Sequence, residues 1–350
     1  MTHKEITFRA AILVESESPL VIEEVAWNGP LGEGQILVKV EFAGICGKQL
    51  EEIDAHFGPD PYLPHLLGHE GAGEVIAVGD GVSKVSPTDS VIMHWMKGSG
   101  IESALPKYSW RGKPLNAGLI TTFNQYAVVS ENRVTKLTED LRLDHACLLG
   151  CGLSTGLGVV LNEAKVNRSQ RVVVWGAGGV GLAAIQACRW VGVEEIVVID
   201  RSEVALEKAA ANGATSTFDC SRDGWQSRLS EKHPDGFDRG LVCVGYPRPL
   251  EELHKFMAAP SELFMVGVPS PSATANIDVL AIHQRKALMG SYGGGIRPDV
   301  DLPSYVRMIK TNQVVVKDIV GPTVSLDNIN EGIDVTKKGG AGRVLVKLWS

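Results

Sequence analysis

Long apolar runs are missing from this sequence. No stretch reaches the roughly 18 apolar residues of a membrane-spanning helix, and charged or polar residues interrupt the first segment, Met1 to Arg9, unlike a secretory signal. We therefore expect a cytoplasmic protein that has no membrane partner.

An excess of basic residues is also missing. The chain has 34 lysine and arginine residues against 41 aspartate and glutamate residues, a formal net charge of −7. Proteins that bind nucleic acids usually present a clustered basic face to the phosphates. We expect no nucleic-acid partner.

Cysteine is too sparse for a disulfide framework. Six cysteines in 350 residues fall below the density of small secreted disulfide-rich domains, so reduced thiols are expected. Cys147, Cys188, Cys220 and Cys243 are interpreted as small buried apolar residues. The other two cysteines lie in glycine-containing motifs.

Two different patterns divide the chain, whose 350 residues suit two domains of ordinary size. Short β-branched or alternating runs, such as residues 73–79, predict a β-rich region over residues 8–137. From residue 171 the pattern changes, and it predicts a strand at 172–175, a helix at 180–190 and a strand at 195–199. These three elements form a β-α-β unit.

The same alternation continues toward the C-terminus. Helices are expected at 202–212 and near 250–257, and strands near 239–244 and at 263–268. Consecutive units of this kind build a parallel, doubly wound sheet. A strand at 286–292 would close the sheet, and its apolar exposed edge predicts pairing with a second copy in a homodimer or homotetramer.

A glycine-rich turn follows the strand at 172–175. Glycine lets the backbone turn tightly and approach a pyrophosphate, and the N-terminus of the next helix offers free N–H groups. Such a turn alone is a weak signal, but Asp200 ends the next strand about twenty residues later, where its carboxylate can bind both ribose hydroxyls. The sequence therefore predicts a dinucleotide site made by Gly176, Gly178, Gly179, Val180, Gly181 and Asp200.

The choice of cofactor depends on two neighbouring residues. Asp200 favours NAD, because its charge would repel the 2′-phosphate of NADP. Arg201 can stack on the adenine, or can accommodate that phosphate if the carboxylate turns away. Val268, at the end of the strand predicted at 263–268, is assigned to the same cofactor site.

Two cysteines and one histidine are candidate metal ligands. Cys46 lies in Ala-Gly-Ile-Cys-Gly, His69 in Leu-Gly-His-Glu-Gly and Cys151 in Leu-Gly-Cys-Gly. Two thiolates and an imidazole suit Zn²⁺ with a fourth position left open, as in catalytic zinc sites. Each residue taken singly is more often structural, and their wide spacing does not join them.

These three motifs in this order, followed by the glycine turn, resemble the zinc-dependent medium-chain alcohol dehydrogenases. Stretches at 108–114, 122–132 and 329–333 are similar to the liver-type branch in particular. The resemblance implies an α/β fold in two parts. A GroES-like β-rich catalytic domain would comprise residues 1–151 and 292–350, and a Rossmann dinucleotide-binding domain residues 152–291.

The resemblance also implies roles for single residues. Cys46, His69 and Cys151 become the ligands of the catalytic zinc, and Arg343 becomes a pyrophosphate contact. Glu70 becomes an acidic catalytic residue that can approach the metal, or alternatively an ion-pair partner behind the ligands. The zinc would act as a Lewis acid on the alcohol oxygen, and hydride would pass to the nicotinamide.

Two positions after Cys46 depart from the family pattern. Lys48 stands where relatives usually carry the Ser or Thr that begins a proton relay. A nearby metal disfavours the ammonium form, which makes a catalytic proton-transfer role for Lys48 chemically reasonable; an ion pair with Glu51 is the alternative. Gln49 stands where Asp commonly orients the zinc-bound histidine, and its carbonyl can still accept the imidazole N–H.

A further departure concerns the structural zinc lobe of many relatives, which holds four closely spaced cysteines. The stretch between His94 and Tyr126 contains no cysteine. One zinc per subunit is therefore expected.

The segment Met93 to Lys97 matches the strand end that lines the substrate pocket in the family. Trp95 would narrow this pocket, whereas His94, Lys97 and Lys48 would bring polar or positive groups to it. Such a pocket favours a polyol, a sugar-like alcohol or an acidic alcohol. The alternative is that Trp95 belongs to the core and Lys97 is a surface charge.

The function predicted from these residues is zinc-dependent hydride transfer between a small-molecule alcohol and NAD. The main alternative is an NADPH-dependent carbonyl or enal reductase on the same scaffold, because the proton-relay position is unusual. A non-catalytic cofactor-binding protein is a third possibility, which the presence of all three zinc-ligand candidates disfavours.

Overall fold

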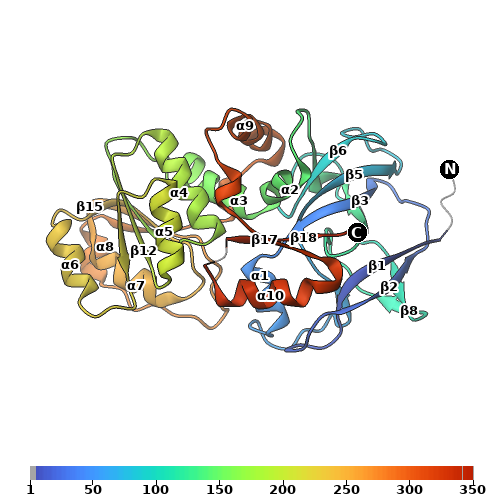
Figure 1. The fold of residues 1–350 in the computed structure, drawn as a ribbon, viewed down its shortest axis with the longest axis horizontal. Helices are drawn as coiled ribbons and strands as arrows, with labels where there is room; N and C mark the ends of the chain where they lie inside the picture. Colours follow the sequence, from blue (N-terminus) through green and yellow to red (C-terminus); the bar gives the residue numbers. More distant parts are fainter. Residues whose placement is uncertain (1–4, 341, 350) are drawn as a thin grey trace.

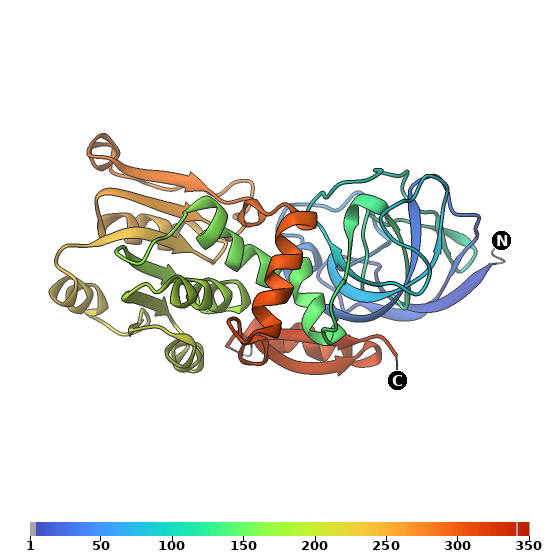
Figure 2. The same cartoon turned by 90° about the horizontal axis from the view of Figure 1, so that it is seen from above.

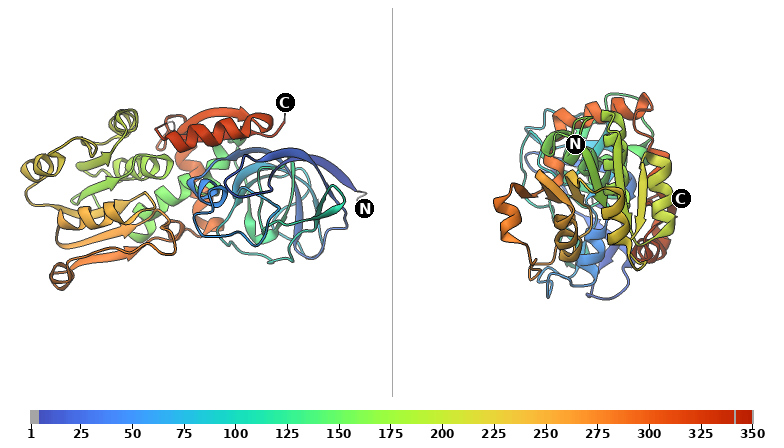
Figure 3. Two further views of the ribbon diagram at one scale, coloured as in Figure 1. Left: turned by 90° about the horizontal axis from the view of Figure 1, so that it is seen from below. Right: turned by 90° about the vertical axis from the view of Figure 1, so that its left-hand side faces the viewer.

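The computed structural model describes residues 5–340 and 342–349. Figure 1 shows two lobes side by side along the longest axis, with the N-terminal strands in one lobe and the elements from α4 (Gly179–Val191) to α8 (Val279–His283) in the other. The same two lobes are visible from below in Figure 3. They correspond to the β-rich and the alternating patterns of the sequence.

Two mainly antiparallel sheets form the β-rich lobe. One has the strand order β4-β1-β2-β7-β8, and the other runs β10-β6-β5-β3-β18-β17, with β9 also paired to β3. Alternating side chains of these strands fill the core between the sheets. The strands are β1 Ile6–Leu13, β2 Val21–Trp27, β3 Gln35–Gly44, β4 His65–Leu66, β5 Glu70–Val78, β6 Ser90–His94, β7 Tyr108–Trp110, β8 Lys113–Leu115, β9 Tyr126–Ser130 and β10 Val134–Lys136.

Short helices connect these strands and lead to the second lobe. A core of small and apolar side chains packs around α3, where Leu153 and Leu157 share one buried cluster with Val172, Leu182 and Tyr305. The two lobes are therefore joined by common packing. The connecting helices are α1 Gly47–Ile53, η1 Glu131–Arg133, α2 Leu143–Ala146, η2 Cys147–Gly150, α3 Gly152–Gly158 and the π-helix η3 Val159–Glu163.

The second lobe is a parallel sheet with helices on both faces, which confirms the predicted doubly wound α/β fold. Its strand order is β13-β12-β11-β14-β15-β16, and every pairing is parallel. Its elements are β11 Arg171–Trp175, α4, β12 Glu195–Asp200, α5 Glu203–Asn212, β13 Ser216–Asp219, α6 Trp225–Lys232, β14 Phe237–Val242, α7 Pro247–Lys255, β15 Met257–Met265, α8 and β16 Lys286–Gly290.

The structure differs from the sequence prediction in several elements of this lobe. The strand predicted at 263–268 is β15, which begins at Met257 and ends at Met265, and β16 ends at Gly290. The pair β13 and α6 was not predicted, because four and eight residues are too few to show a clear hydrophobic period.

The C-terminal segment returns to the first lobe. Helix α9 (Pro298–Lys310) crosses between the lobes, as Figure 2 shows, and β18 (Arg343–Lys347) pairs with β3 so that Leu345 lies opposite Gly44. This pairing brings Arg343 beside Cys46. The remaining elements are η4 Gly293–Gly295, η5 Val316–Asp318, β17 Val320–Ser325, η6 Leu326–Asn328 and α10 Ile329–Lys338.

The exact domain division at 151/152 and 291/292 stays a prediction. Within the described part of the chain, no single helix is both long and apolar enough to cross a membrane; the segments Leu143–Gly150 and Gly152–Glu163, which meet at 59°, reach the required length and composition only as a bent pair.

Candidate metal and cofactor site

The three candidate metal ligands come together in the structure. Cys46 precedes the first turn of α1, His69 lies just before β5, and Cys151 precedes α3. Their ligand atoms all lie within 4.8 Å of one another, and Nε2 of His69 is 3.2 Å from Sγ of Cys151. Residues that are up to 105 positions apart in the chain thus form one cluster.

This donor set fits a zinc ion. Zinc–sulfur bonds of about 2.3 Å and zinc–nitrogen bonds of about 2.0–2.1 Å in a tetrahedral site place neighbouring ligand atoms roughly 3.5–3.8 Å apart. The 3.2 Å between His69 and Cys151 lies just below this range, and the 4.8 Å upper bound for the three ligand atoms lies above it, so small side-chain shifts bring the atoms to zinc-binding distances. Three protein ligands would leave one position for an exogenous oxygen, as in catalytic zinc sites.

The electrostatics of the cluster also suit a cation. A hydrogen bond from the Cys151 thiol holds the pKa of Cys46 well below its usual value, and the same contact, together with burial, raises the pKa of Cys151. Burial lowers the pKa of His69, but the Cys46 sulfur outweighs it and raises that pKa overall. These shifts favour the thiolate form of Cys46, and a bound metal would displace protons from the other ligands.

Gln49 is buried behind His69. Its Oε1 accepts a hydrogen bond from the backbone N–H of Cys46 at 3.0 Å, while its Nε2 faces Nδ1 of His69. The expectation that the carbonyl accepts the imidazole N–H is therefore wrong in this conformation. The physical reason is that the Cys46 N–H lies at the start of a helix, has no intrahelical partner and takes the carbonyl.

Glu70 is paired with Arg343. Oε1 of Glu70 is 3.1 Å from Nε of Arg343, and Oε2 accepts a hydrogen bond from the Gly152 N–H at 2.9 Å. Burial raises the pKa of Glu70, although Arg343 opposes this shift. Burial acts against the charge on Arg343, but Glu70 keeps the guanidinium pKa raised. Nε of Arg343 also lies 3.5 Å from the position that a Cβ on Gly179 would take, beside the glycine turn.

The glycine turn has the geometry of an anion-binding helix start. Helix α4 begins with Gly179 and Val180, and Gly178 precedes it without a side-chain cap, so its first N–H groups are free to bind an anion. Gly176 has φ of +98°. A Cβ on Gly181 would lie 1.8 Å from the Gly176 carbonyl oxygen, so only glycine allows the helix to approach the strand this closely.

Asp200 lies against this turn. Its Oδ2 accepts a hydrogen bond from the Ala177 N–H at 2.7 Å, and its Oδ1 accepts one from the Ser202 N–H at 2.9 Å. The carboxylate is thus held where the ribose of a nucleotide bound to the turn would lie. The neighbouring Arg201 is exposed.

The loops that follow β14 and β15 lie at the same carboxyl edge of the parallel sheet as the glycine turn. The carbonyl oxygen of Val268 lies 2.3 Å from the position of a Cβ on Gly245, which leaves no room for a side chain there. Parallel sheets of this type bind dinucleotides at the carboxyl ends of their strands. Oε1 of Glu51, from α1 in the other lobe, lies 3.3 Å from the same Cβ position. Sequence reasoning missed this contact and considered Glu51 only as a counterion.

Lys48 contacts a different acid from the one expected. Its Nζ lies 3.3 Å from the ring centroid of Phe57 and 3.8 Å from Oε1 of Glu52. The suggested pairing with Glu51 is replaced by one with Glu52, which lies four residues after Lys48 on the same helix face, because the Glu51 carboxylate lies beside Gly245 of the other lobe.

His94 does not supply the polar group that the sequence predicted for the substrate pocket. His94 is fully buried; its Nδ1 contacts the Met96 carbonyl oxygen at 2.7 Å and its Nε2 contacts Thr135 Oγ1 at 3.0 Å. Burial lowers the pKa of His94 to about 4. His94 therefore adds no free polar group to a pocket, which corrects the expectation from sequence.

The next residues of this segment are accessible. Trp95 is half-buried and packs edge-on against Tyr292, with ring centroids 5.0 Å apart. Lys97 is exposed and forms an ion pair with Glu102 at 2.8 Å. The accessible groups of the segment are therefore one aromatic ring, Trp95, and one lysine that is held in an ion pair.

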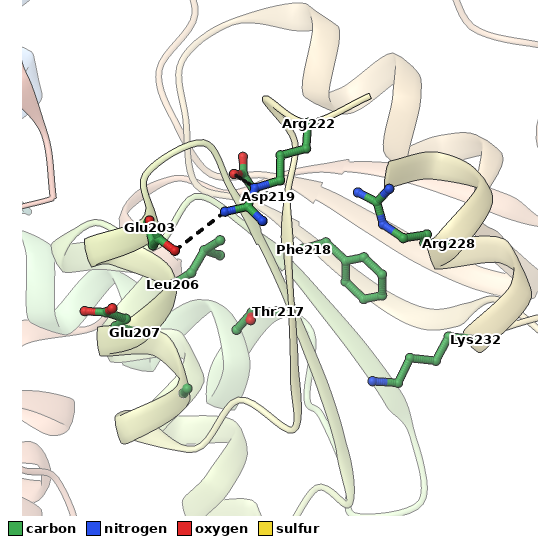
Figure 4. Close-up of a pocket in the computed structure, with 10 residues that line it drawn as sticks. Glu203, Leu206, Glu207, Thr217, Phe218, Asp219, Arg222, Arg228 and Lys232 are labelled. Carbon is green, nitrogen blue, oxygen red and sulfur yellow. Dashed lines mark hydrogen bonds and ion pairs between the residues drawn. The ribbon is translucent and has the colours of Figure 1, made fainter. Parts of the chain in front are cut away.

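A cavity of about 560 Å³ lies apart from these residues, between α5, β13 and α6. Figure 4 shows acidic and basic side chains around it, including the ion pair of Arg222 with Glu203. Arg222 also pairs with Asp219 at 2.8 Å. None of the predicted site residues lines this cavity, so it is not part of the candidate site.

Comparisons with known proteins agree with the two lobes. Residues 32–139 match the alcohol dehydrogenase GroES-like domain, and residues 179–311 match the zinc-binding dehydrogenase domain. Alcohol dehydrogenase 6 of Peromyscus maniculatus is 30% identical over 96% of this chain and 96% of its own length. The crystal structure of benzyl alcohol dehydrogenase from Acinetobacter calcoaceticus is 25% identical, with a TM-score of 0.90 over 98% of this chain and 100% of its own. The fold is shared with an alcohol dehydrogenase zinc-binding domain protein from Burkholderia ambifaria. The two are 24% identical, with a TM-score of 0.92 over 99% of this chain and 100% of the other.

Proposed function

Because the chain belongs to the zinc-dependent medium-chain alcohol dehydrogenase family, we propose that it oxidises an alcohol to a carbonyl compound with NAD and one zinc per subunit. The observation that carries this proposal is the meeting of Cys46, His69 and Cys151 within 4.8 Å. Arg343 links this cluster to the glycine turn, since it contacts Glu70 on one side and lies beside Gly179 on the other.

Each part of the site has a role in this proposal. A bound zinc would polarise the alcohol oxygen, and the nicotinamide would accept the hydride. Cys46, His69 and Cys151 would hold the metal. The residues proposed to hold the cofactor are Gly176, Gly178, Gly179, Val180, Gly181, Asp200, Arg201, Val268 and Arg343.

Glu70 is proposed to act mainly through Arg343. An approach of Glu70 to the metal would require it to leave both Arg343 and the Gly152 N–H. Breaking a buried ion pair costs about 3–5 kcal/mol. The ion-pair role, which keeps the guanidinium beside the glycine turn, is therefore favoured over direct approach to the metal.

NAD is proposed over NADP because Asp200 lies against the turn through the Ala177 N–H. A 2′-phosphate there would face this carboxylate. NADPH-dependent carbonyl or enal reduction is the alternative, and it requires the carboxylate to turn away and Arg201 to replace it.

Two substrate classes are proposed for testing. A polyol, sugar-like or acidic alcohol is supported by Lys48, although His94 no longer contributes to such a pocket. An aromatic alcohol is the second candidate, because Trp95 and Tyr292 form an aromatic pair at the segment that lines the family's substrate pocket. The structurally similar benzyl alcohol dehydrogenase is consistent with this class.

A homodimer is also proposed. Strand β16 is the last strand of its sheet, and the neighbouring α8 exposes Val279, Leu280 and Ile282 at 76%, 60% and 44%. Apolar residues at an open sheet edge favour pairing with a second copy. A tetramer would add a second interface.

The proposed function is tested by metal analysis and a turnover screen on the purified protein. We expect one zinc per subunit and NAD-dependent oxidation within a panel of polyols, acidic alcohols and aromatic alcohols. Cys46→Ala and His69→Ala should abolish turnover but leave NAD binding largely intact, because both residues lie outside the parallel-sheet lobe. Cys220→Ala, a cysteine outside the cluster, is the matched control.

Three results would contradict the proposal. Two zincs per subunit, or full activity without zinc, would overturn the assigned metal site. Turnover only with NADPH and carbonyl substrates would favour the reductase. NAD binding without any turnover would favour a non-catalytic binding protein.

A further inference from the structure

Trp95 lies between the candidate metal site and the parallel sheet. Strands β5 and β6 pair so that Glu70 lies opposite His94. One residue further along this antiparallel register, Trp95 reaches the level of the candidate ligand His69. A Cβ on Gly293, just after β16, would lie 2.9 Å from Cζ2 of Trp95. The indole therefore lies beside the space between the metal ligands and the cofactor edge of the sheet.

The segment that carries Trp95 depends on hydrogen bonds for its position. Residues 95–107 lie between β6 and β7 without forming a helix or a strand. Nδ1 of His94 donates to the Met96 carbonyl oxygen at 2.7 Å, because a carbonyl can only accept. The Arg133 guanidinium donates to the Trp95 carbonyl oxygen. These contacts hold one side of the segment to the first lobe.

Asp299, in the first turn of α9, holds the same segment from the other side. Its Oδ2 accepts a hydrogen bond from the Ser99 N–H at 2.6 Å, and a Cβ on Gly98 would lie 2.8 Å from this oxygen. Its Oδ1 forms an ion pair with Lys84 at 2.6 Å. The Lys84 ammonium also donates to the carbonyl oxygens of Ser99 and Val134, at 3.0 and 2.9 Å. Its three N–H groups are thus all used.

The Asp299 carboxylate keeps its charge in this position. Burial acts against the charge, but the contacts with Lys84 and Ser99 outweigh burial and lower the pKa of Asp299 overall. Hydrogen bonds to a charged group are stronger than those between neutral groups. Helix α9 crosses between the lobes, as Figure 2 shows. Asp299 therefore ties the Trp95 segment to the part of the chain that connects the two lobes.

We propose that Asp299 is a positioning residue that fixes Trp95 and thereby sets the size of the alcohol that the site accepts. This inference rests on the proposed dehydrogenase function and deepens it by assigning a specificity determinant. Asp299 acts through Ser99 and Lys84 rather than by contact with the substrate. A firmly held indole excludes a bulky substituent that needs its space, because close-packed side chains yield little. An indole on a released segment moves aside and admits it.

Hydrogen–deuterium exchange tests the anchor itself. Asp299→Ala removes both acceptor oxygens, so exchange of the backbone amides in residues 95–101 should accelerate roughly tenfold, as for the loss of a hydrogen bond to a charged group. Asp299→Asn keeps one acceptor oxygen and should show a smaller effect. Lys310→Gln is the matched control, since it breaks the ion pair with Glu139 at the other end of α9. It should exchange like the wild type in residues 95–101.

Turnover measures the effect on specificity. It compares two alcohols of one class that differ in bulk, benzyl and para-tert-butylbenzyl alcohol or glycerol and sorbitol. In Asp299→Ala the ratio of kcat/KM for the smaller alcohol to that for the larger should fall roughly tenfold, mainly through KM. Trp95→Ala should lower the same ratio. The double variant should lower it no further than Trp95→Ala, because two changes that act through one side chain are not additive.

The outcomes separate this inference from the proposed function. Unchanged exchange in residues 95–101 of Asp299→Ala would overturn the anchor. An unchanged kcat/KM ratio despite faster exchange, or additive effects in the double variant, would overturn the specificity role while alcohol oxidation by the wild type stands. A wild-type protein that oxidises no alcohol would instead refute the proposed function, and the specificity role with it.

Discussion

The Gln49 side chain joins Cys46 and His69, with its amide nitrogen toward Nδ1 of the imidazole and its oxygen bound to the Cys46 N–H. A metal bound through Nε2 of His69 leaves the proton on Nδ1, which then needs an acceptor. Gln49 can provide one only by rotating its amide and giving up the Cys46 N–H. This competition should weaken the metal site.

Gln49→Asp should therefore increase zinc affinity, by roughly tenfold or more, since outer ligands of this kind change metal affinity 10–100-fold. Competition with a chelator of known affinity measures the change. Gln49→Asn keeps an uncharged amide and is the control. Equal zinc affinities for Gln49→Asp and the wild type would show that the amide does not limit binding.

Asp200→Ala should relax the cofactor preference toward NADP. Removal of the carboxylate removes its repulsion of a 2′-phosphate, and the ratio of kcat/KM for NADP to that for NAD should rise by roughly tenfold or more. Asp200→Asn removes the charge but keeps one acceptor oxygen, and with it at most one of the two hydrogen bonds from the Ala177 and Ser202 N–H groups, whereas Asp200→Ala removes both. A wild-type protein with the higher kcat/KM for NADP would assign the decisive contact to Arg201.

Lys48→Ala should lower kcat by roughly 10²-fold if Lys48 shares in proton transfer. For that role the ammonium must leave the Phe57 ring and Glu52. Lys48→Arg is informative because arginine keeps the charge but does not release a proton in proteins. Loss of activity in both variants supports proton transfer, whereas a kcat near the wild-type value with an intact pH profile would show that Lys48 takes no part in it.

Leu280→Glu should convert the proposed dimer to monomer. Leu280 is 60% exposed on α8 beside the edge strand β16, and a charge there would be buried if a second copy packs on this edge. Light scattering at micromolar concentration measures the mass. Val204→Glu, at a comparably exposed apolar residue on α5, should leave the dimer intact. A monomeric wild-type protein would contradict the prediction.

Short-range patterns in the sequence were sufficient for the cofactor turn. The strand, glycine turn, helix and Asp200 lie within 30 residues, from β11 to the end of β12, and local backbone geometry brings them together. The doubly wound sheet follows from the same repeated units. Short polar elements such as β13 and α6 were missed, because their few residues show no clear period. The metal ligands were grouped by family resemblance, since no local rule joins Cys46 to Cys151.

The direction of single side chains was decided only by the tertiary structure. Cys46 and its neighbours lie on a short helix whose surroundings come from β3, β18 and a loop of the other lobe. Packing against these distant segments turns Glu51 toward Gly245, leaves Glu52 for Lys48 and brings Arg343 to Glu70. The sequence by itself determined which chemical groups are available and the local turns that carry them. Which of these groups face one another depends on contacts between residues far apart in the chain, and a sequence pattern with a period of a few residues contains no information about them.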